Sequence, residues 1–278
     1  MEEETTGVAG GTRVLVSGCM GKMGTEIVKA VHAAHDLTLA GGYDPLAGKG
    51  SILIDGSEVA PAFTDLSVAL AEVKPDVLID FTMPSAAPDN LALALAEGVS
   101  CVLGTSGVPT AKLEELIATA PEGTALFVAP NFTTGAVLMM MLSKLAAPYF
   151  EDIEIFEFHH NNKKDSPSGT AVATAEMMAD ARMGTEVMST APGSETELAA
   201  YPGARGSEYQ ESGIRIHSVR TNGYMATQEI LYGSPGQRMT IRHDTFDRNS
   251  YMPGILLALR KVKSLSGLVI GLEELMEL

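Results

Sequence analysis

Short apolar runs and segments of helical length alternate along the first half of the chain. The apolar runs cover residues 13–17, 37–43, 76–81, 100–103 and 125–129. The segments of helical length cover residues 23–34, 85–97 and 110–119. This repeat predicts a parallel, doubly wound sheet, because a parallel connection needs a crossover that is usually a helix. Such sheets bind their ligands beyond the carboxyl ends of the strands.

The pattern changes after residue 133. A methionine-rich helix opens this half, and another helix is predicted over residues 170–182. Segments with the two-residue period of strands cover residues 153–158, 214–220, 226–233 and 238–244. Together they predict an α+β domain with a mixed, mainly antiparallel sheet. We therefore expect a Rossmann-like domain over residues 1–132, completed by residues 249–278, and a second domain over residues 133–248.

The composition narrows the class of protein. The 278 residues are 45% hydrophobic and 19% charged, which is typical of a globular protein. The formal net charge of −16 argues against nucleic acid as a partner, because phosphate binding needs a basic surface. We expect no membrane association, since the chain shows neither a signal peptide pattern nor an apolar run of spanning length. Cys19 and Cys101 are the two cysteines, so no disulfide framework is implied and a cytoplasmic location is expected.

A glycine-rich turn joins the first predicted strand to the first predicted helix. Gly18, Gly21 and Gly24 have the spacing G-x-x-G-x-x-G, which lets a pyrophosphate approach a helix N-terminus closely. Asp44 ends the second predicted strand at about the distance, roughly 20 residues, where a ribose-binding carboxylate is expected. An ordinary turn is the alternative for the glycines alone. Together with Asp44, they predict a dinucleotide-binding site.

The ends of later predicted strands extend this site, and Asp44 influences which cofactor it can bind. The segments D-F-T at 80–82, G-T-S-G at 104–107 and P-N-F at 130–132 follow strands, so the cofactor crevice should include them. Asp44 can bind a free ribose 2′-hydroxyl and would repel a 2′-phosphate, and no arginine adjoins it. Lys22 would offset part of that repulsion. We therefore predict that NADH serves at least as well as NADPH.

The second distinctive stretch is E-F-H-H-N-N-K-K-D-S-P-S-G-T-A at residues 157–171. It predicts a strand end, a polar loop and a helix start, with Ser166 as N-cap and Pro167 at the first helical position. The N–H groups of the first helical turn and the helix dipole favour an anion. Two histidines and two lysines stand just upstream. The stretch thus predicts a site for a small carboxylate, with His and Lys available to move protons.

A solvated basic loop before a well-capped helix is the alternative for any single residue of that stretch. The joint occurrence of tandem His, Lys and the S-P-S-G-T segment favours the site, because convergent groups carry more weight than single ones. His217 and His243 are expected on strand faces, since no compact cluster of metal ligands accompanies them. No metal site is predicted.

These motifs resemble those of the bacterial dihydrodipicolinate reductases, also called 4-hydroxy-tetrahydrodipicolinate reductases, of lysine and diaminopimelate biosynthesis. The resemblance covers almost the whole chain. It rests on V-S-G-C-M-G-K-M-G at 16–24, D-F-T, G-T-S-G, A-P-N-F at 129–132 and E-x-H-H-x-x-K-x-D-x-P-S-G-T-A at 157–171. The last signature is specific to the family, whereas the glycine turn is not.

The resemblance implies an NAD(P)H-dependent oxidoreductase. The reaction reduces (2S,4S)-4-hydroxy-2,3,4,5-tetrahydrodipicolinate, a cyclic dicarboxylate, to 2,3,4,5-tetrahydrodipicolinate with loss of water. It also implies a homotetramer in which the second domain binds substrate and joins the subunits.

The resemblance assigns acid–base catalysis to His159 and proton donation to Lys163. The substrate-binding positions that it implies are His160, Ser168, Gly169 and Thr170. The cofactor-binding positions are Gly18, Cys19, Met20, Gly21, Lys22, Met23, Gly24, Asp44, Phe81, Gly104, Thr105, Ser106, Ala129, Pro130, Asn131 and Phe132. Departures from the commoner family residues occur at Ser106, Ser166 and Thr227. Only a secondary role is in question there, at Thr227, where relatives often have His.

Two other hypotheses remain open on the sequence. A different two-domain dehydrogenase, acting on a semialdehyde or on diaminopimelate, would share the glycine turn but lack the tandem-His and S-G-T constellation. A nicotinamide-binding regulatory protein without turnover need not keep His159, His160 or Lys163, all of which are present.

Overall fold

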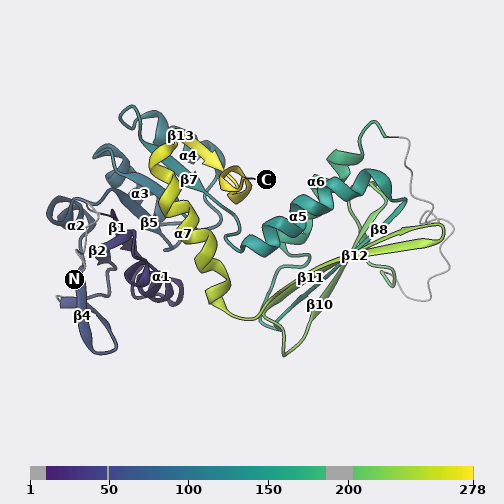
Figure 1. The fold of residues 1–278 in the computed structure, drawn as a ribbon, viewed down its shortest axis with the longest axis horizontal. Coiled ribbons are helices and arrows are strands. Elements are labelled where there is room, and N and C mark those ends of the chain that lie inside the picture. Colours follow the sequence, from purple (N-terminus) through teal and green to yellow (C-terminus); the bar gives the residue numbers. More distant parts are fainter. Residues whose placement is uncertain (1–10, 49, 186–202, 278) are drawn as a thin grey trace, which may run out of the picture. The chain divides into compact units, whose positions relative to one another are not determined.

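The computed structural model describes residues 11–48, 50–185 and 203–277, which fold as two compact units (Figure 1). Unit 1 is Met1–Thr133 with Tyr251–Leu278, and unit 2 is Thr134–Ser250.

Unit 1 is built on an eight-stranded sheet with the strand order β13-β7-β6-β5-β1-β2-β4-β3. Its strands are β1 (Thr12–Ser17), β2 (Leu37–Tyr43), β3 (Gly50–Ile54), β4 (Ser57–Phe63), β5 (Val77–Asp80), β6 (Ser100–Leu103), β7 (Ala125–Val128) and β13 (Gly267–Ile270). The helices are α1 (Lys22–Ala33), α2 (Leu66–Val73), α3 (Ala87–Ala96), α4 (Thr110–Ala118) and α7 (Met252–Lys261), with short 3-10 turns η4 (Val262–Ser264) and η5 (Leu272–Leu275). Apart from β3 with β4, the described strand pairs are parallel. The predicted doubly wound sheet is confirmed.

Alternation along the strands assigns the helices of unit 1 to two layers. Leu15 and Leu78 pack into one buried cluster with apolar residues of α2, α3 and α4. Their neighbours Val14, Val16 and Ile79 are also fully buried and point to the opposite face. Helices α1 and α7 contact β1 and each other on that second face. The sheet is therefore covered on both sides, which explains why its strands are apolar runs without alternation.

Unit 2 is built on a five-stranded sheet with the order β12-β11-β8-β10-β9. Its strands are β8 (Asp152–His159), β9 (Ser207–Glu208), β10 (Ile214–Arg220), β11 (Ala226–Ser234) and β12 (Gln237–Thr245). The helices are α5 (Thr134–Ala146) and α6 (Gly169–Arg182), with 3-10 turns η1 (Ala147–Tyr149) and η3 (Arg248–Tyr251), the latter ending at the first residue of the C-terminal part of unit 1. Strand β10 pairs with β8 in parallel and the other pairs are antiparallel, so the sheet is mixed as predicted.

Helices α5 and α6 pack against one face of this sheet (Figure 1). Ile153 and Ile155 of β8 are buried under them, together with Met178 of α6. The two-residue period of β8 then carries Glu157 to the same face, where its side chain is fully buried. The strand thus delivers a carboxylate to the edge of an apolar core, next to the loop that leads into α6.

Candidate active site

The glycine turn of unit 1 is packed tightly against its surroundings. Gly18 has a φ of +80°, and a Cβ atom there would lie 2.7 Å from the carbonyl oxygen of Phe81. A Cβ atom at Gly24 would collide with the carbonyl group of Gly18, so the turn and α1 pack backbone against backbone. Among the described residues no side chain caps α1 at Gly21, and the first turn of α1 holds no acidic residue. Its N–H groups can therefore bind an anion.

Asp44 ties the end of β2 to this turn. Its carboxylate accepts hydrogen bonds from the N–H groups of Met20 (3.2 Å) and Leu46 (2.9 Å), and the residue is 9% exposed. The neighbouring Cys19 is buried, and a Cβ atom at Gly42 would lie 2.7 Å from its sulfur. Burial, and then the charge of Asp44, raise the pKa of the Cys19 thiol to about 11. The thiol therefore stays protonated, and its role is packing.

A buried carboxylate joins several strand ends; the sequence analysis included it only as the first residue of the D-F-T segment. Asp80 is fully buried and accepts hydrogen bonds from Ser17 Oγ (2.8 Å) and Asn90 Nδ2 (2.8 Å) on one oxygen. Its other oxygen accepts from the Thr82 N–H (3.1 Å), the Thr82 hydroxyl (2.7 Å) and the Thr105 hydroxyl (3.0 Å). In the sequence, the signal for Asp80 was a single acidic residue at the end of an apolar strand. Asp80 thereby connects β1, β5, α3 and the loop after β6.

Other predicted cofactor residues meet around Phe81. Its ring lies 5.7 Å from the ring of Phe132, and a Cβ atom at Gly104 would collide with it. Ala129 donates from its N–H to the carbonyl oxygen of Leu103 (3.4 Å), which joins the ends of β6 and β7. Lys22, Met23, Ser106, Pro130 and Asn131 lie in or beside the same turns, and the side-chain oxygen of Asn131 accepts a hydrogen bond from the Thr133 N–H. The loops of the sequence prediction thus gather at one edge of the sheet.

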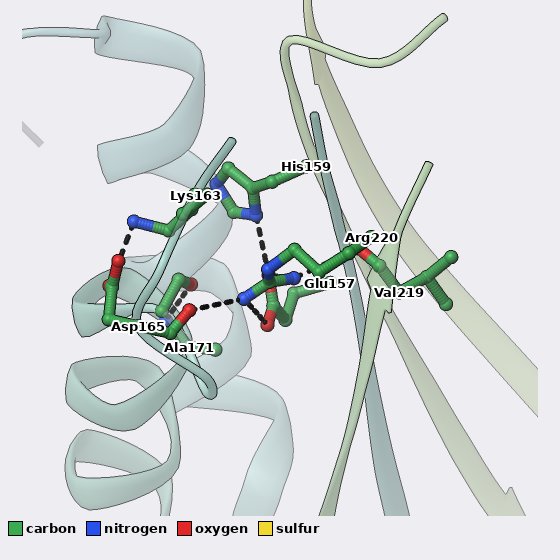
Figure 2. A network of polar contacts seen from close by, with 8 residues as sticks. Glu157, His159, Lys163, Asp165, Ala171, Val219 and Arg220 are labelled. Carbon is green, nitrogen blue, oxygen red and sulfur yellow. Dashed lines mark hydrogen bonds and ion pairs between the residues drawn. The ribbon is translucent and has the colours of Figure 1, made fainter. Parts of the chain in front are cut away.

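In unit 2, Glu157 lies between His159 and Arg220 (Figure 2). His159 Nδ1 lies 2.5 Å from Glu157 Oε2, within hydrogen-bond distance. The guanidinium group of Arg220 donates to both carboxylate oxygens of Glu157, at 3.0 Å and 2.7 Å. Glu157 is fully buried, while the side chains of His159 and Arg220 are 15% and 18% exposed. The imidazole therefore has one edge held by the core and the other toward the surface.

Lys163 belongs to the same network through the loop (Figure 2). Its ammonium group lies 2.8 Å from Asp165 Oδ2, and the Lys163 side chain is 23% exposed. Arg220 donates to the backbone carbonyl oxygen of Asp165 at 2.7 Å. Arg220 therefore contacts both the residue that binds His159 and the residue that binds Lys163.

The start of α6 corrects one prediction. The N-cap is Ser168, whose hydroxyl accepts from the Ala171 N–H at 3.2 Å, and the helix begins at Gly169. Ser166 and Pro167 precede the cap, because the chain turns into the helix two residues later than the S-P pattern indicated. The first intrahelical bond runs from the Val172 N–H to the Ser168 carbonyl oxygen, so the N–H groups of the first turn stand ahead of it.

The predicted substrate-binding residues differ in exposure. His160 and Gly169 are exposed and Thr170 is partly exposed. Thr227 instead donates its hydroxyl to Asp244 at 2.8 Å. Within the described ranges, no group of three or more His, Cys, Asp or Glu side chains could hold a metal ion, and no helix there is long and apolar enough to cross a membrane.

The Glu157 network predicts acid sensitivity. Burial raises the pKa of Glu157, but hydrogen bonds from His159, Arg220 and Ser218 outweigh burial and lower it from 4.5 to about 2. A carboxylate with a lowered folded-state pKa stabilises the fold above its unfolded pKa, and this contribution is lost as the pH falls from 4.5 toward 2. Between pH 4.5 and about 2, the unfolding free energy of the unmodified protein should therefore fall by on the order of 3 kcal/mol more than that of Glu157→Gln. Urea unfolding at several pH values measures this, and parallel curves for the two proteins would contradict it.

The fold and these sites define an NAD(P)H-dependent oxidoreductase. The family description "Dihydrodipicolinate reductase, N-terminus" matches residues 12–132, and "Dihydrodipicolinate reductase, C-terminus" matches residues 135–276. The chain belongs to the dihydrodipicolinate reductase family, whose members act in lysine and diaminopimelate biosynthesis. The resemblance noted from the motifs is confirmed.

Relatives and solved structures agree with this membership. A 4-hydroxy-tetrahydrodipicolinate reductase of Listeria monocytogenes serotype 4b is 45% identical over 95% of this chain and 100% of its own. The one of Mycolicibacterium smegmatis is 43% identical over 96% and 99%. The structure of a dipicolinate-bound dihydrodipicolinate reductase from Paenisporosarcina sp. TG-14 has a TM-score of 0.82 at 37% identity, covering 96% of this chain and 100% of that one. An amine dehydrogenase from Mycobacterium smegmatis, with a TM-score of 0.63 at 14% identity over 93% and 94% of the two chains, shares the fold alone.

Proposed function

We propose that this chain reduces 4-hydroxy-tetrahydrodipicolinate through His159 and Lys163, with NADH serving at least as well as NADPH. The observation that supports the residue roles is the network in which His159 and Lys163 are joined through Glu157, Arg220 and Asp165. A relative solved with dipicolinate, a cyclic dicarboxylate, supports the substrate class.

The start of α6 is proposed to bind a substrate carboxylate. The N–H groups of Gly169 and Thr170 lie at the positive end of the helix dipole. Ser168 is 2% exposed; its hydroxyl accepts from Ala171 and keeps its own proton. His160 lies in the loop just before this turn and is exposed. These groups suit a flat anion with two acceptor oxygens.

Proton transfer is assigned to Lys163 and His159. The bound nicotinamide supplies the hydride. Lys163 holds an ammonium proton that it can deliver to the ring atom that gains electron density, and Asp165 keeps the ammonium in place. His159 can take or give a proton at Nε2, because Nδ1 is held by Glu157. A proton is also needed where water leaves, so two proton-transfer groups suit this reaction.

The nucleotide is proposed to lie on the edge of unit 1 formed by the glycine turn and the loops after β2, β5, β6 and β7. Gly18 and Gly24 let the turn pack closely against the backbone around it, and α1 offers uncapped N–H groups. Asp44 already accepts two backbone hydrogen bonds. A carboxylate has about four acceptor sites, so capacity remains for ribose hydroxyls.

The cofactor preference follows from Asp44. We expect kcat/KM with NADH to equal or exceed that with NADPH, because the buried Asp44 carboxylate repels a 2′-phosphate and Lys22 offsets only part of that repulsion. Lys22 is exposed at the start of α1, so Lys22→Ala should lower the NADPH rate more than the NADH rate. Side-by-side assays with NADH and NADPH measure the ratio of the two kcat/KM values for the unmodified protein and for Lys22→Ala. A preference for NADPH of about tenfold, worth about 1.4 kcal/mol, would contradict the assignment.

For His159→Gln we expect kcat to fall by about tenfold, less than for the loss of Lys163, because water takes over part of the proton transfer. KM should change little, since the α6 start and His160 remain. Steady-state kinetics at saturating cofactor measure both parameters. Unchanged kcat would remove His159 from the mechanism.

We also propose a homotetramer joined through the sheet of unit 2 and a cytoplasmic location. Within the described residues of unit 2, helices cover only one face of that sheet, which leaves the other face for contacts between subunits. Light scattering on the purified protein tests the assembly.

The experiment that tests the activity is a coupled assay. A synthase makes the unstable substrate from pyruvate and aspartate semialdehyde, and oxidation of NADH and NADPH is followed. Rapid oxidation that depends on the synthase is expected. Folded protein that binds NADH but oxidises neither cofactor would instead support a nicotinamide-binding protein without turnover.

A further inference from the structure

We propose that Glu157 is a positioning residue that fixes the tautomer and the direction of the His159 imidazole. Arg220 holds Glu157 and also sets the loop that carries Lys163. This proposal rests on the function proposed above, because Glu157 and Arg220 would act on the reaction only through His159 and Lys163.

The burial of Glu157 is the first reason. Its side chain is 0% exposed and lies on the core face of β8, in line with Ile153 and Ile155. A carboxylate removed from water destabilises a fold unless charged or polar groups pair with it. The chain keeps it there, with Ser218 as a further hydrogen-bond donor beside His159 and Arg220. An apolar residue would continue the pattern of this strand, so the acid points to a task beyond packing.

The geometry of His159 is the second reason. An ionised carboxylate can only accept, so the 2.5 Å contact requires the proton of neutral His159 to be on Nδ1. Nε2 is then the nitrogen that exchanges a proton, and the ring cannot turn over without breaking this hydrogen bond. Glu157 thus selects one of two tautomers and one of two ring orientations.

Arg220 completes the arrangement. Besides its two bonds to Glu157, its guanidinium donates to the carbonyl oxygens of Val219 (2.9 Å) and Asp165 (2.7 Å). Its Nε is buried and has no hydrogen-bond partner among the described residues. A guanidinium can make these contacts at once because its donors form a planar fork, which a lysine ammonium cannot reproduce. Arg220 therefore transmits the position of Glu157 to Asp165, and Asp165 pairs with Lys163.

The opposite face of β8 supplies a matched comparison. Glu154 accepts from His217 at 2.5 Å and from Arg205 at 3.4 Å, so it has the same types of partner as Glu157. His217 stacks on Phe156, with ring centres 4.4 Å apart, and has no part in the proposed reaction. Glu154→Gln therefore alters the same chemistry, on the same strand, away from His159.

The first measurement is the tautomer of His159 by nitrogen-15 NMR of the full chain without ligands. The six histidines give separable imidazole signals, and the His159→Gln variant identifies the signal of His159. In the unmodified protein, neutral His159 should carry its proton on Nδ1. In Glu157→Gln the Nε2–H tautomer should become populated, because an amide can donate to Nδ1 as well as accept from it. Glu154→Gln should leave the His159 signal unchanged.

The second measurement is kinetic. Glu157→Gln should lower kcat by about tenfold to a hundredfold with a change in KM of less than about threefold, because substrate contacts remain while proton transfer is impaired. Glu157→Asp keeps a carboxylate and should restore part of the rate. Arg220→Lys should lower kcat as well, and it serves as the test if Glu157→Gln does not fold. Glu154→Gln, compared at equal oligomeric state, should stay within about twofold of the unmodified protein.

Two results would overturn the proposal: a His159 tautomer that does not respond to Glu157→Gln, or an active Glu157→Gln protein with unchanged kcat. A loss of thermal stability with unchanged kcat would show a merely structural ion pair. Failure of the proposed function is distinguishable, because an unmodified protein without reductase activity would still report the tautomer.

Discussion

Lys163→Ala lowers kcat by about two to four orders of magnitude if Lys163 is the proton donor. The ammonium is partly buried and held by Asp165 at 2.8 Å, so its position is set before substrate binds. The alanine substitution removes the ammonium group and its proton. Among the described residues, no other lysine contacts Asp165 and could take its place. The drop should appear in kcat at saturating substrate and cofactor, measured in the coupled assay.

The kinetic pattern separates this role from simple binding. A rise in KM with kcat unchanged would mean that Lys163 only attracts the dicarboxylate. Lys144→Ala is the matched control, because Lys144 is an exposed lysine on α5 of the same unit and should leave both parameters within about twofold. A hundredfold loss in the control would show that the general positive charge, rather than Lys163, is what matters.

Asp80→Ala lowers the unfolding free energy by on the order of 3 kcal/mol. Asp80 is fully buried, and alanine would leave the donors of Ser17, Asn90 and Thr105 without their acceptor. Because Thr82 and Thr105 lie in loops at the proposed nucleotide edge, NADH affinity should also fall, by about tenfold or more. Urea unfolding and titration of NADH fluorescence measure the two effects.

The control for this change is Glu115→Ala. Glu115 is 67% exposed and, among the described residues, pairs with Lys112 alone on the surface of α4, so its loss should cost less than about 0.5 kcal/mol. A loss of unfolding free energy below about 1 kcal/mol for Asp80→Ala would mean that solvent or neighbouring groups replace the carboxylate. The hydrogen bonds of Asp80 would then not be needed for stability.

Several features of the fold were readable from local pattern. The alternation of apolar runs and helical segments predicted the sheet of unit 1, and the two-residue period predicted the strands of unit 2. The hairpin of β3 and β4 was missed, although its turn, Asp55-Gly56, has a known signature. Both residues have positive φ, at 50° and 80°, as the favoured two-residue hairpin turns require. Strand β13 was missed because its four residues form a strand only by pairing with β7.

The sequence by itself determined the family, the order of most strands and helices, and the positions of the glycine turn and the His–Lys loop. Each is a local pattern, because period, turn chemistry and motif spacing extend over no more than about 20 residues. The tertiary structure alone decided which groups hold those residues. Glu157 and Arg220 are 63 positions apart, as are Ser17 and Asp80. Such pairs meet only because strands distant in the chain lie side by side, and burial away from water then makes each hydrogen bond between them necessary.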